Sequence, residues 1–231
     1  FHSARWDHSR PLDGKRVAVI GTGASSIQFV PQIAPRVDRL HLFQRTPPWI
    51  VPKRDRPITD RERWLFEHVP GTHWLRRTGL YWLMEGRVLG FAFAPKVNQL
   101  AERLVLANLA KSVSDPELRA KLTPNYRLGC KRVLISNDYY PALQRPNVEL
   151  VTDAISRVEP DGIRTVDGRL HQVDTIIWGT GFRVADYVSS MKLVGRGGRE
   201  LNEVWSESVR NYLGINVSGF PNLFLLMGPN T

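Results

Sequence analysis

The sequence predicts an α/β fold built on a parallel sheet, with a helical segment inserted in the middle of the chain. A short apolar run, residues 17–20, leads directly into a glycine turn that begins at Gly21. A helical stretch, residues 27–34, and a second apolar run, residues 40–43, follow. Strand, helix and strand in this order form the unit of a parallel α/β sheet. Between residues 60 and 122, apolar side chains recur at spacings of three and four, which predicts helices.

The first predicted strand ends in Gly21-Thr-Gly23, which has the form of a phosphate-binding turn. Gly21 allows the tight turn, Gly23 lets the backbone approach the phosphates, and the following helix directs its N-terminus at the anion. Ser26 replaces the third glycine of the Gly-x-Gly-x-x-Gly pattern, at a position that normally lets helix and strand pack closely. The context of strand and helix still predicts a Rossmann-like dinucleotide-binding domain.

The second predicted strand ends in residues that suit a phosphate. About 20 residues after the first glycine, a domain specific for NAD places Asp or Glu to bind the ribose hydroxyls. Residues 40–54 contain no carboxylate and offer Gln44, Arg45 and Thr46 instead. A guanidinium binds phosphate through two hydrogen bonds and stays charged, and the Thr46 hydroxyl adds a neutral donor. We therefore predict NADP(H); the alternative is that Arg45 is a solvated loop charge.

The later part of the chain is predicted to complete the sheet. A buried strand at 173–178 ends in the loop Gly179-Thr180-Gly181-Phe182, at the carboxyl end of a strand, where α/β sheets place ligands. The predicted elements are a helix starting at 114–117, a short helix at 138–144, a strand at 148–151, a hairpin at 155–166, a strand at 173–178 and a final strand at 222–227.

Length and composition predict a globular chain without membrane spans. The 231 residues are 42% apolar, but no run approaches the ~20 residues needed to cross a bilayer, and no secretory leader is visible. The single cysteine, Cys130, excludes an internal disulfide and fits a reducing, cytoplasmic location. Because the chain begins with Phe1, we expect it to come from a longer protein.

The net charge of +10 suggests nucleic-acid binding as an alternative function. The basic residues, however, are scattered among tryptophans and prolines, and no helix-turn-helix or zinc-ligand spacing is visible. A cofactor with several phosphates also requires positive charge nearby. We therefore predict no nucleic-acid partner, no membrane partner and no metal site.

Five segments carry motifs that occur together in one known family. Residues 1–7 place His, Trp and Asp as in the second half of a family fingerprint, and residues 21–28 match its NADPH-binding turn. Residues 43–47 match the exit of its second strand, and residues 128–132 carry its Lys-Arg pair. The loop 179–182 is similar to an Ala-Thr-Gly-Phe loop with glycine replacing alanine. The chain thus resembles the flavin-dependent Baeyer–Villiger-type monooxygenases, within the flavin-containing monooxygenase superfamily.

This resemblance implies roles for individual residues. Lys131 would join Arg45 and Thr46 at the 2′-phosphate of NADPH. Arg132 would be the catalytic residue, because the matching arginine lies over the flavin, where a fixed guanidinium can stabilise negative charge. The implied cofactor-binding residues are Gly21, Thr22, Gly23, Ala24, Ser25, Ser26, Gln28, Arg45, Thr46, Lys131, Thr180 and Gly181.

The resemblance also implies a division of the chain and an activity. Residues 1–14 would form an interdomain linker, residues 15–56 and 123–182 the NADPH-binding domain, residues 57–122 a helical insertion, and residues 183–231 a partial return to an FAD-binding domain. The intact enzyme would bind NADPH, FAD and a ketone and insert oxygen next to the carbonyl. This chain, with only one unit of the Gly-x-Gly-x-x-Gly type, would be inactive alone, and the FAD site would lie mostly outside it. The alternatives are an amine- or sulfide-oxygenating relative and a stand-alone NADP(H)-binding module.

Overall fold

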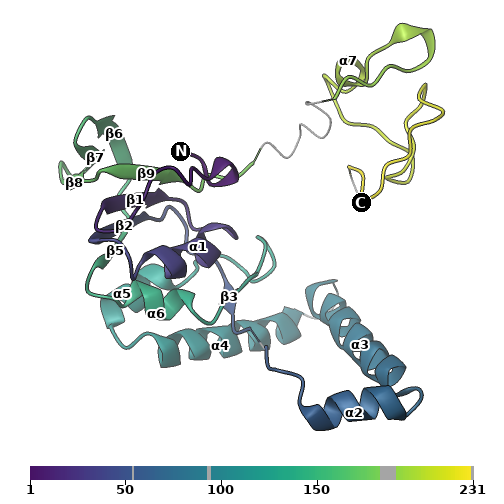
Figure 1. Cartoon of the computed structure of the whole chain (residues 1–231), viewed down its shortest axis with the longest axis horizontal. Coiled ribbons are helices and arrows are strands. Elements are labelled where there is room, and N and C mark those ends of the chain that lie inside the picture. The colour runs from purple at the N-terminus through teal and green to yellow at the C-terminus, as the bar shows by residue number, and fades with distance from the viewer. Residues whose placement is uncertain (54, 93–94, 183–190, 230–231) are drawn as a thin grey trace. The chain divides into compact units, whose positions relative to one another are not determined.

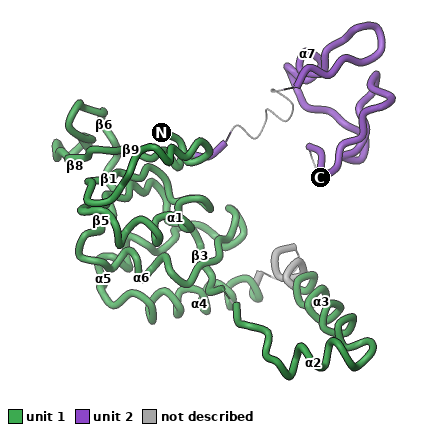
Figure 2. The backbone as a smooth tube through the Cα atoms, in the orientation of Figure 1, with its two compact units in different colours: residues 1–180 green, residues 181–231 purple. Residues whose placement is uncertain are grey.

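The chain divides into two compact units, Phe1–Thr180 and Gly181–Thr231 (Figure 2). The first unit contains the sheets and all but one of the labelled α-helices, and the second contains α7, Leu201–Val204. The computed structural model describes residues 1–53, 55–92, 95–182 and 191–229.

The first unit is built around a four-stranded parallel sheet in the order β5-β2-β1-β9 (Figure 1). From the inner strand β1, the chain continues first to β2 on one side and later to β9 on the other, so the strand order reverses beside β1. Open α/β sheets bind ligands outside the carboxyl ends of their strands at such a switch point. The strands are Arg16–Ile20 (β1), Arg39–Phe43 (β2), Val148–Val151 (β5) and Thr175–Trp178 (β9). The predicted α/β fold with a parallel sheet is confirmed.

The strand register brings three loops to one edge of this sheet. Ile20 pairs with Phe43 on one side and with Trp178 on the other. Hydrogen bonds continue the pairing beyond the strand ends: the Gly21 N–H donates to the Phe43 carbonyl at 3.0 Å, and the Gly179 N–H donates to the Ile20 carbonyl at 2.9 Å. The loops that follow β1, β2 and β9 therefore start side by side.

Helices cover one face of the parallel sheet. Helix α1, Ser26–Ile33, buries Ile27, Val30 and Ile33, whose spacing of three places them on one side of the helix. Helix α6, Tyr139–Leu143, packs beside α1. Both helices share a core with alternate residues of β1 and β2, and burying each Val or Leu completely stabilises the fold by about 1.5–3 kcal/mol. The fully buried strand residues of this face are Val17, Val19, Leu40 and Leu42.

A small antiparallel sheet, β6-β7-β8, packs against the opposite face. Its strands are Ile155–Glu159 (β6), Gly162–Thr165 (β7) and Leu170–Gln172 (β8), so the predicted hairpin is confirmed. Ile163 is fully buried there with Ala18 and Phe43. Polar side chains are also buried on this face, and burial lowers the pKa of His41 to about 4.

Along the chain, the predicted helical segment comes between β2 and β5. The Thr59 hydroxyl accepts a hydrogen bond from the Glu62 backbone N–H, and the Glu62 carboxylate accepts one from the Thr59 N–H, which together form a capping box. The last helix of this segment starts within 114–117, as predicted, and the side chain of Asp115 caps it. Among the described residues, no helix has the length and hydropathy needed to cross a membrane. The helices are Asp60–His68 (α2), Thr72–Ala92 (α3), Pro95–Ser112 (α4) and Pro116–Leu122 (α5).

A short parallel pair joins the two ends of the helical segment. Strand β3, Ile50–Val51, pairs with β4, Leu134–Ile135. The Leu134 N–H donates to the Trp49 carbonyl at 2.8 Å, and the Ser136 N–H donates to the Val51 carbonyl at 3.1 Å. The chain therefore enters and leaves the helical segment at neighbouring points.

The second unit corrects one prediction. Residues 222–227 form no strand and contribute only an isolated bridge between Asn216 and Phe224. A strand requires a paired neighbour, and within residues 191–229 this apolar run has no other ladder partner. Its side chains at Leu226 and Met227 are 95% and 91% exposed, as an unpaired run would be. Helix α7 contributes Leu201 to a small core that also contains Trp205, Val217 and Phe220, whereas the short helix η2, Arg196–Gly198, buries no side chain.

Candidate nucleotide-binding site

The turn after β1 has the backbone conformation that a phosphate-binding turn requires. Gly21 has φ +106°, and a Cβ atom there would collide with the Gly179 carbonyl oxygen, so only glycine fits. A Cβ added at Gly23 would meet no atom within 4 Å, so the backbone at this point faces open space. The turn can therefore accept a ligand against its main chain at Gly23.

The beginning of α1 presents backbone donors without acceptors. Within the described part of the chain, the N–H groups of residues 23–26 make no hydrogen bond, whereas the Ile27 N–H is already bound to the Gly23 carbonyl. The first turn of α1 contains no acidic residue. Unpaired N–H groups at the positive end of a helix dipole form an anion site. The start of α1 thus suits a phosphate group.

Ser26 occupies the position where the glycine pattern places its third glycine. Its side chain is completely buried, and its hydroxyl has no hydrogen-bond partner among the described residues. A Cβ atom built on Gly179 would lie 2.5 Å from the Ser26 Oγ. The hydroxyl therefore fills the space beside Gly179, and a buried hydroxyl without a partner at this turn can donate to a bound anion.

The loop after β2 lies next to the turn. The Thr22 hydroxyl donates to the Thr46 carbonyl at 3.4 Å, which connects the two loops. Gln44 is buried, and its side-chain amide donates to the Lys121 carbonyl at 2.8 Å. This bond gives Gln44 a structural role. Arg45, in contrast, is exposed and has no ion pair with any described carboxylate. The Arg45 guanidinium is therefore free to bind an anion.

Lys131 and Arg132 lie in the loop between α5 and β4. Both side chains are exposed, and the Lys131 ammonium lies 4.6 Å from the centre of the Tyr126 ring. Trp49 donates from its ring nitrogen to the Tyr126 carbonyl at 2.9 Å. Because Trp49 follows the β2 exit directly, this bond and the β3–β4 pair hold the Lys131 loop beside the segment that carries Arg45.

The remaining predicted residues are Thr180 and Gly181, which follow β9, and Gln28 of α1. Thr180 is exposed and is the last residue of the first unit, at the carboxyl edge where β1 and β9 diverge. Gly181 begins the second unit with φ +96°. Gln28 lies in the first turn of α1, where its side-chain amide donates to the Ala24 carbonyl at 2.8 Å and so steadies the turn. Sequence reasoning missed the Thr22–Thr46 bond and the match between Ser26 and Gly179, since neither has a local signature.

Among known proteins, no protein-family model matches the chain. Over all 231 residues the chain is 54% identical to a Baeyer–Villiger monooxygenase of Pseudomonas aeruginosa and 47% identical to another of Streptomyces coelicolor, and it spans 44% of the length of each. It superimposes on a closed crystal structure of cyclohexanone monooxygenase with a TM-score of 0.81 at 29% identity, covering all of this chain and 50% of that one. A crystal structure of OTEMO in complex with FAD and NADP gives a TM-score of 0.77 at 30% identity, covering 99% of this chain and 51% of that one.

The parallel sheet, the glycine turn after β1 and the switch point beside β1 define the class of fold: the first unit is a Rossmann-like α/β domain. Along its whole length the chain is similar to proteins named Baeyer–Villiger monooxygenase, and it spans less than half of the length of the curated relatives it matches.

Proposed function

We propose that this chain binds NADPH as part of an FAD-dependent monooxygenase that inserts one oxygen atom next to a ketone carbonyl. The observation that carries the proposal is the set of unpaired backbone donors at residues 23–26. The names of the relatives support the enzyme class, and the solved structure that holds FAD and NADP supports both cofactors.

In this proposal the pyrophosphate binds at the turn from Gly21 to Gln28. Gly23 gives the phosphates access to the main chain, the N–H groups donate to their oxygens, and the buried Ser26 hydroxyl gains a partner. Thr22, Ala24 and Ser25 contribute their backbone to the same cradle. The residues present fit the group because the N–H groups of residues 23–26 lack an acceptor in the described part of the chain, and the first helical turn holds no competing carboxylate.

The 2′-phosphate of NADPH is assigned to Arg45, Thr46 and Lys131. Arg45 offers two parallel donors, whereas Lys131 acts as a point charge. A phosphate bound here neutralises charges that lack a carboxylate partner among the described residues. Thr180 and Gly181, after β9, are assigned to the remaining part of the dinucleotide at the switch point.

Arg132 is assigned to the flavin. Its guanidinium stays charged at every relevant pH, so it can stabilise negative charge that develops at the reacting centre. When bound, the flavin would accept hydride from NADPH and activate dioxygen. FAD is held mostly by other segments of a longer protein in this proposal, so the isolated chain binds NADPH without oxygenating a substrate. A cytoplasmic location, with a small ketone as substrate, completes the proposal.

Calorimetric titration of the 231-residue chain with NADPH and, separately, with NADH tests the nucleotide site. We expect NADPH to bind more tightly, because only NADPH carries the 2′-phosphate. Arg45→Ala should abolish this preference, and Arg145→Ala is its matched control, since Arg145 is exposed in the turn before β5, at the opposite edge of the sheet. Equal affinities would contradict the 2′-phosphate assignment, and binding of neither nucleotide would contradict a nucleotide site carried by this chain alone.

A further inference from the structure

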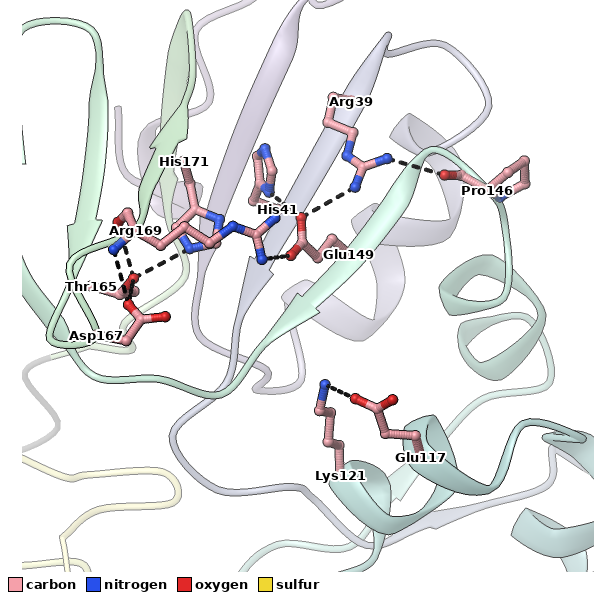
Figure 3. Close-up of polar contacts among 10 residues, drawn as sticks. All are labelled: Arg39, His41, Glu117, Lys121, Pro146, Glu149, Thr165, Asp167, Arg169 and His171. Carbon is pink, nitrogen blue, oxygen red and sulfur yellow. Dashed lines mark hydrogen bonds and ion pairs between the residues drawn. The ribbon is translucent and has the colours of Figure 1, made fainter.

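Two histidines and a glutamate converge between the parallel sheet and the small antiparallel sheet (Figure 3). His41 lies on β2, Glu149 lies directly opposite it on β5, and His171 lies on β8. One ring nitrogen of each histidine and one carboxylate oxygen all lie within 4.8 Å of one another. This group is on the face opposite α1, so it is separate from the loops assigned to the nucleotide.

The hydrogen bonds around His171 determine which ring nitrogen carries the proton. The Thr165 hydroxyl lies 2.6 Å from a carboxylate oxygen of Asp167 and donates to it. A hydroxyl has one proton, so the contact of 3.4 Å between Thr165 Oγ1 and His171 Nε2 requires the histidine to donate. The Nδ1 atom of His171 is then left with a free lone pair. It is buried and has no partner among the described residues.

His41 has a similar unpaired nitrogen. Its side chain is only 8% exposed, and its Nδ1 lies 3.1 Å from a Glu149 oxygen. This contact lacks the direction of a hydrogen bond, so the Nδ1 is also without a hydrogen-bond partner in the described residues. Burying an unpaired polar atom costs about 1–3 kcal/mol, and the fold incurs this cost at two imidazoles whose rings are 5.1 Å apart.

We propose that His41, Glu149 and His171 form a binding site for a divalent transition-metal cation, with zinc as the best-matched ion. Two imidazole nitrogens and one carboxylate oxygen are a donor set that zinc prefers, and a solvent molecule would complete a tetrahedron. Ligands about 2.0–2.2 Å from a tetrahedral zinc are roughly 3.3 Å apart, so small side-chain rotations would close the present spacing. The Thr165 hydroxyl is the outer partner that orients the His171 ring, as hydrogen-bonded outer groups do for metal-binding histidines.

The arginines around Glu149 compete with a cation. Arg39 lies 3.2 Å from one carboxylate oxygen and Arg169 lies 2.7 Å from the other. Both arginine side chains are substantially exposed, so either can move into solvent when a doubly charged ion replaces it. Bound metal would connect β8 of the small sheet to β2 and β5 of the parallel sheet.

Zinc binding to the complete, tag-free 231-residue chain tests the site. After removal of trace metal, titration with zinc chloride should show one ion per chain, and cobalt(II) should give the visible absorption of a tetrahedral complex. His41→Gln and His171→Gln should each weaken zinc binding by at least about tenfold. His8→Gln is the matched control, because His8 is an exposed histidine of the first segment. Circular dichroism of each variant checks that its fold is retained.

Arg169→Gln separates a metal site from a set of ion pairs. It removes a competing charge and no ligand, so zinc should bind more tightly to this variant than to the unmodified chain. Absence of stoichiometric zinc in both the unmodified chain and Arg169→Gln would overturn the proposal. Equal zinc affinity in the unmodified chain and in folded His171→Gln would overturn it as well.

Discussion

Ser26 and Gly179 fit each other across the start of the nucleotide turn. Ser26 carries a hydroxyl where the glycine pattern has none, and Gly179 lacks the methyl group of the matching alanine in the Ala-Thr-Gly-Phe loop. A Cβ atom at Gly179 would lie 2.5 Å from the Ser26 Oγ and 3.2 Å from the Ile20 carbonyl oxygen. The two departures from the family pattern therefore compensate for each other.

We expect Gly179→Ala to destabilise the chain by about 1–3 kcal/mol, the usual cost of an added methyl group in a packed region. Ser26→Gly should relieve much of this loss when both changes are combined, because the collision with the hydroxyl disappears. Urea unfolding of the two single variants and the double variant gives the coupling energy. Strict additivity of the two changes would show that the residues do not compensate.

Arg45→Ala should weaken NADPH binding by about 1.5–3 kcal/mol, the usual contribution of a hydrogen bond to a charged group. NADH binding should change little, since NADH lacks the 2′-phosphate. Lys131→Ala should act in the same direction but less strongly, because a lysine binds phosphate through a point charge. Titration calorimetry at constant ionic strength measures both, and equal losses for the two nucleotides would remove these residues from the 2′-phosphate site.

Arg132→Ala should leave NADPH binding by this chain nearly unchanged. In a full-length enzyme that includes the flavin-binding segments, the same change should abolish oxygenation, because the proposed role of Arg132 is at the flavin. Titration calorimetry of this chain measures NADPH binding, and product formation by gas chromatography measures oxygenation by the full-length enzyme. Full oxygenation by the variant would exclude the catalytic assignment.

Asp174 makes stability depend on pH at the amino-terminal edge of the sheet. It accepts hydrogen bonds from the Arg16 side chain and backbone N–H, which lower its pKa to about 2. Because the folded pKa is below the unfolded one, this contribution is present above about pH 4 and is lost as the pH falls towards 2. Asp174→Asn should therefore lower the Tm modestly at pH 7, and the difference from the unmodified chain should shrink below pH 4. A constant difference across this range would contradict the role of the charge.

The strands that could be predicted are those with continuous apolar runs. β1 and β2 are buried on both faces of a parallel sheet, so β1 appears in the sequence as an uninterrupted apolar run before a glycine turn, and β2 as an apolar run broken only by His41. β3 and β4 contain two residues each and carry no such signal. The apolar run at 222–227 gives the same signal as a buried strand, but pairing depends on a neighbour that the run itself does not encode.

The candidate site was predictable where its residues are close in sequence, as in the turn from Gly21 to Gln28. The cluster of His41, Glu149 and His171 was not, because its members are brought together only by strand register and by the packing of one sheet on another. The zinc-ligand patterns that can be found in sequence place their ligands a few residues apart. The prediction of no metal site rested on the spacing of residues in the sequence, and such spacing does not reveal ligands that come from three separate strands.

The β3–β4 pair described above has a consequence for how this family can vary. Since both ends of the α2–α5 segment are fixed together, the span between them behaves as a closed loop, and the entropic cost of lengthening such a loop grows only slowly with its length. Helices α4 and α5 contribute Leu109 and Leu122 to the main core, and Glu102 of α4 accepts a hydrogen bond from the Leu128 N–H, so they are tied to the loop that carries Lys131. Helix α2 buries no side chain, so homologues can gain or lose helical turns in the α2–α3 part without shifting Arg45 or Lys131. Sequence variation in α2 and α3 should accumulate independently of variation in the nucleotide turn.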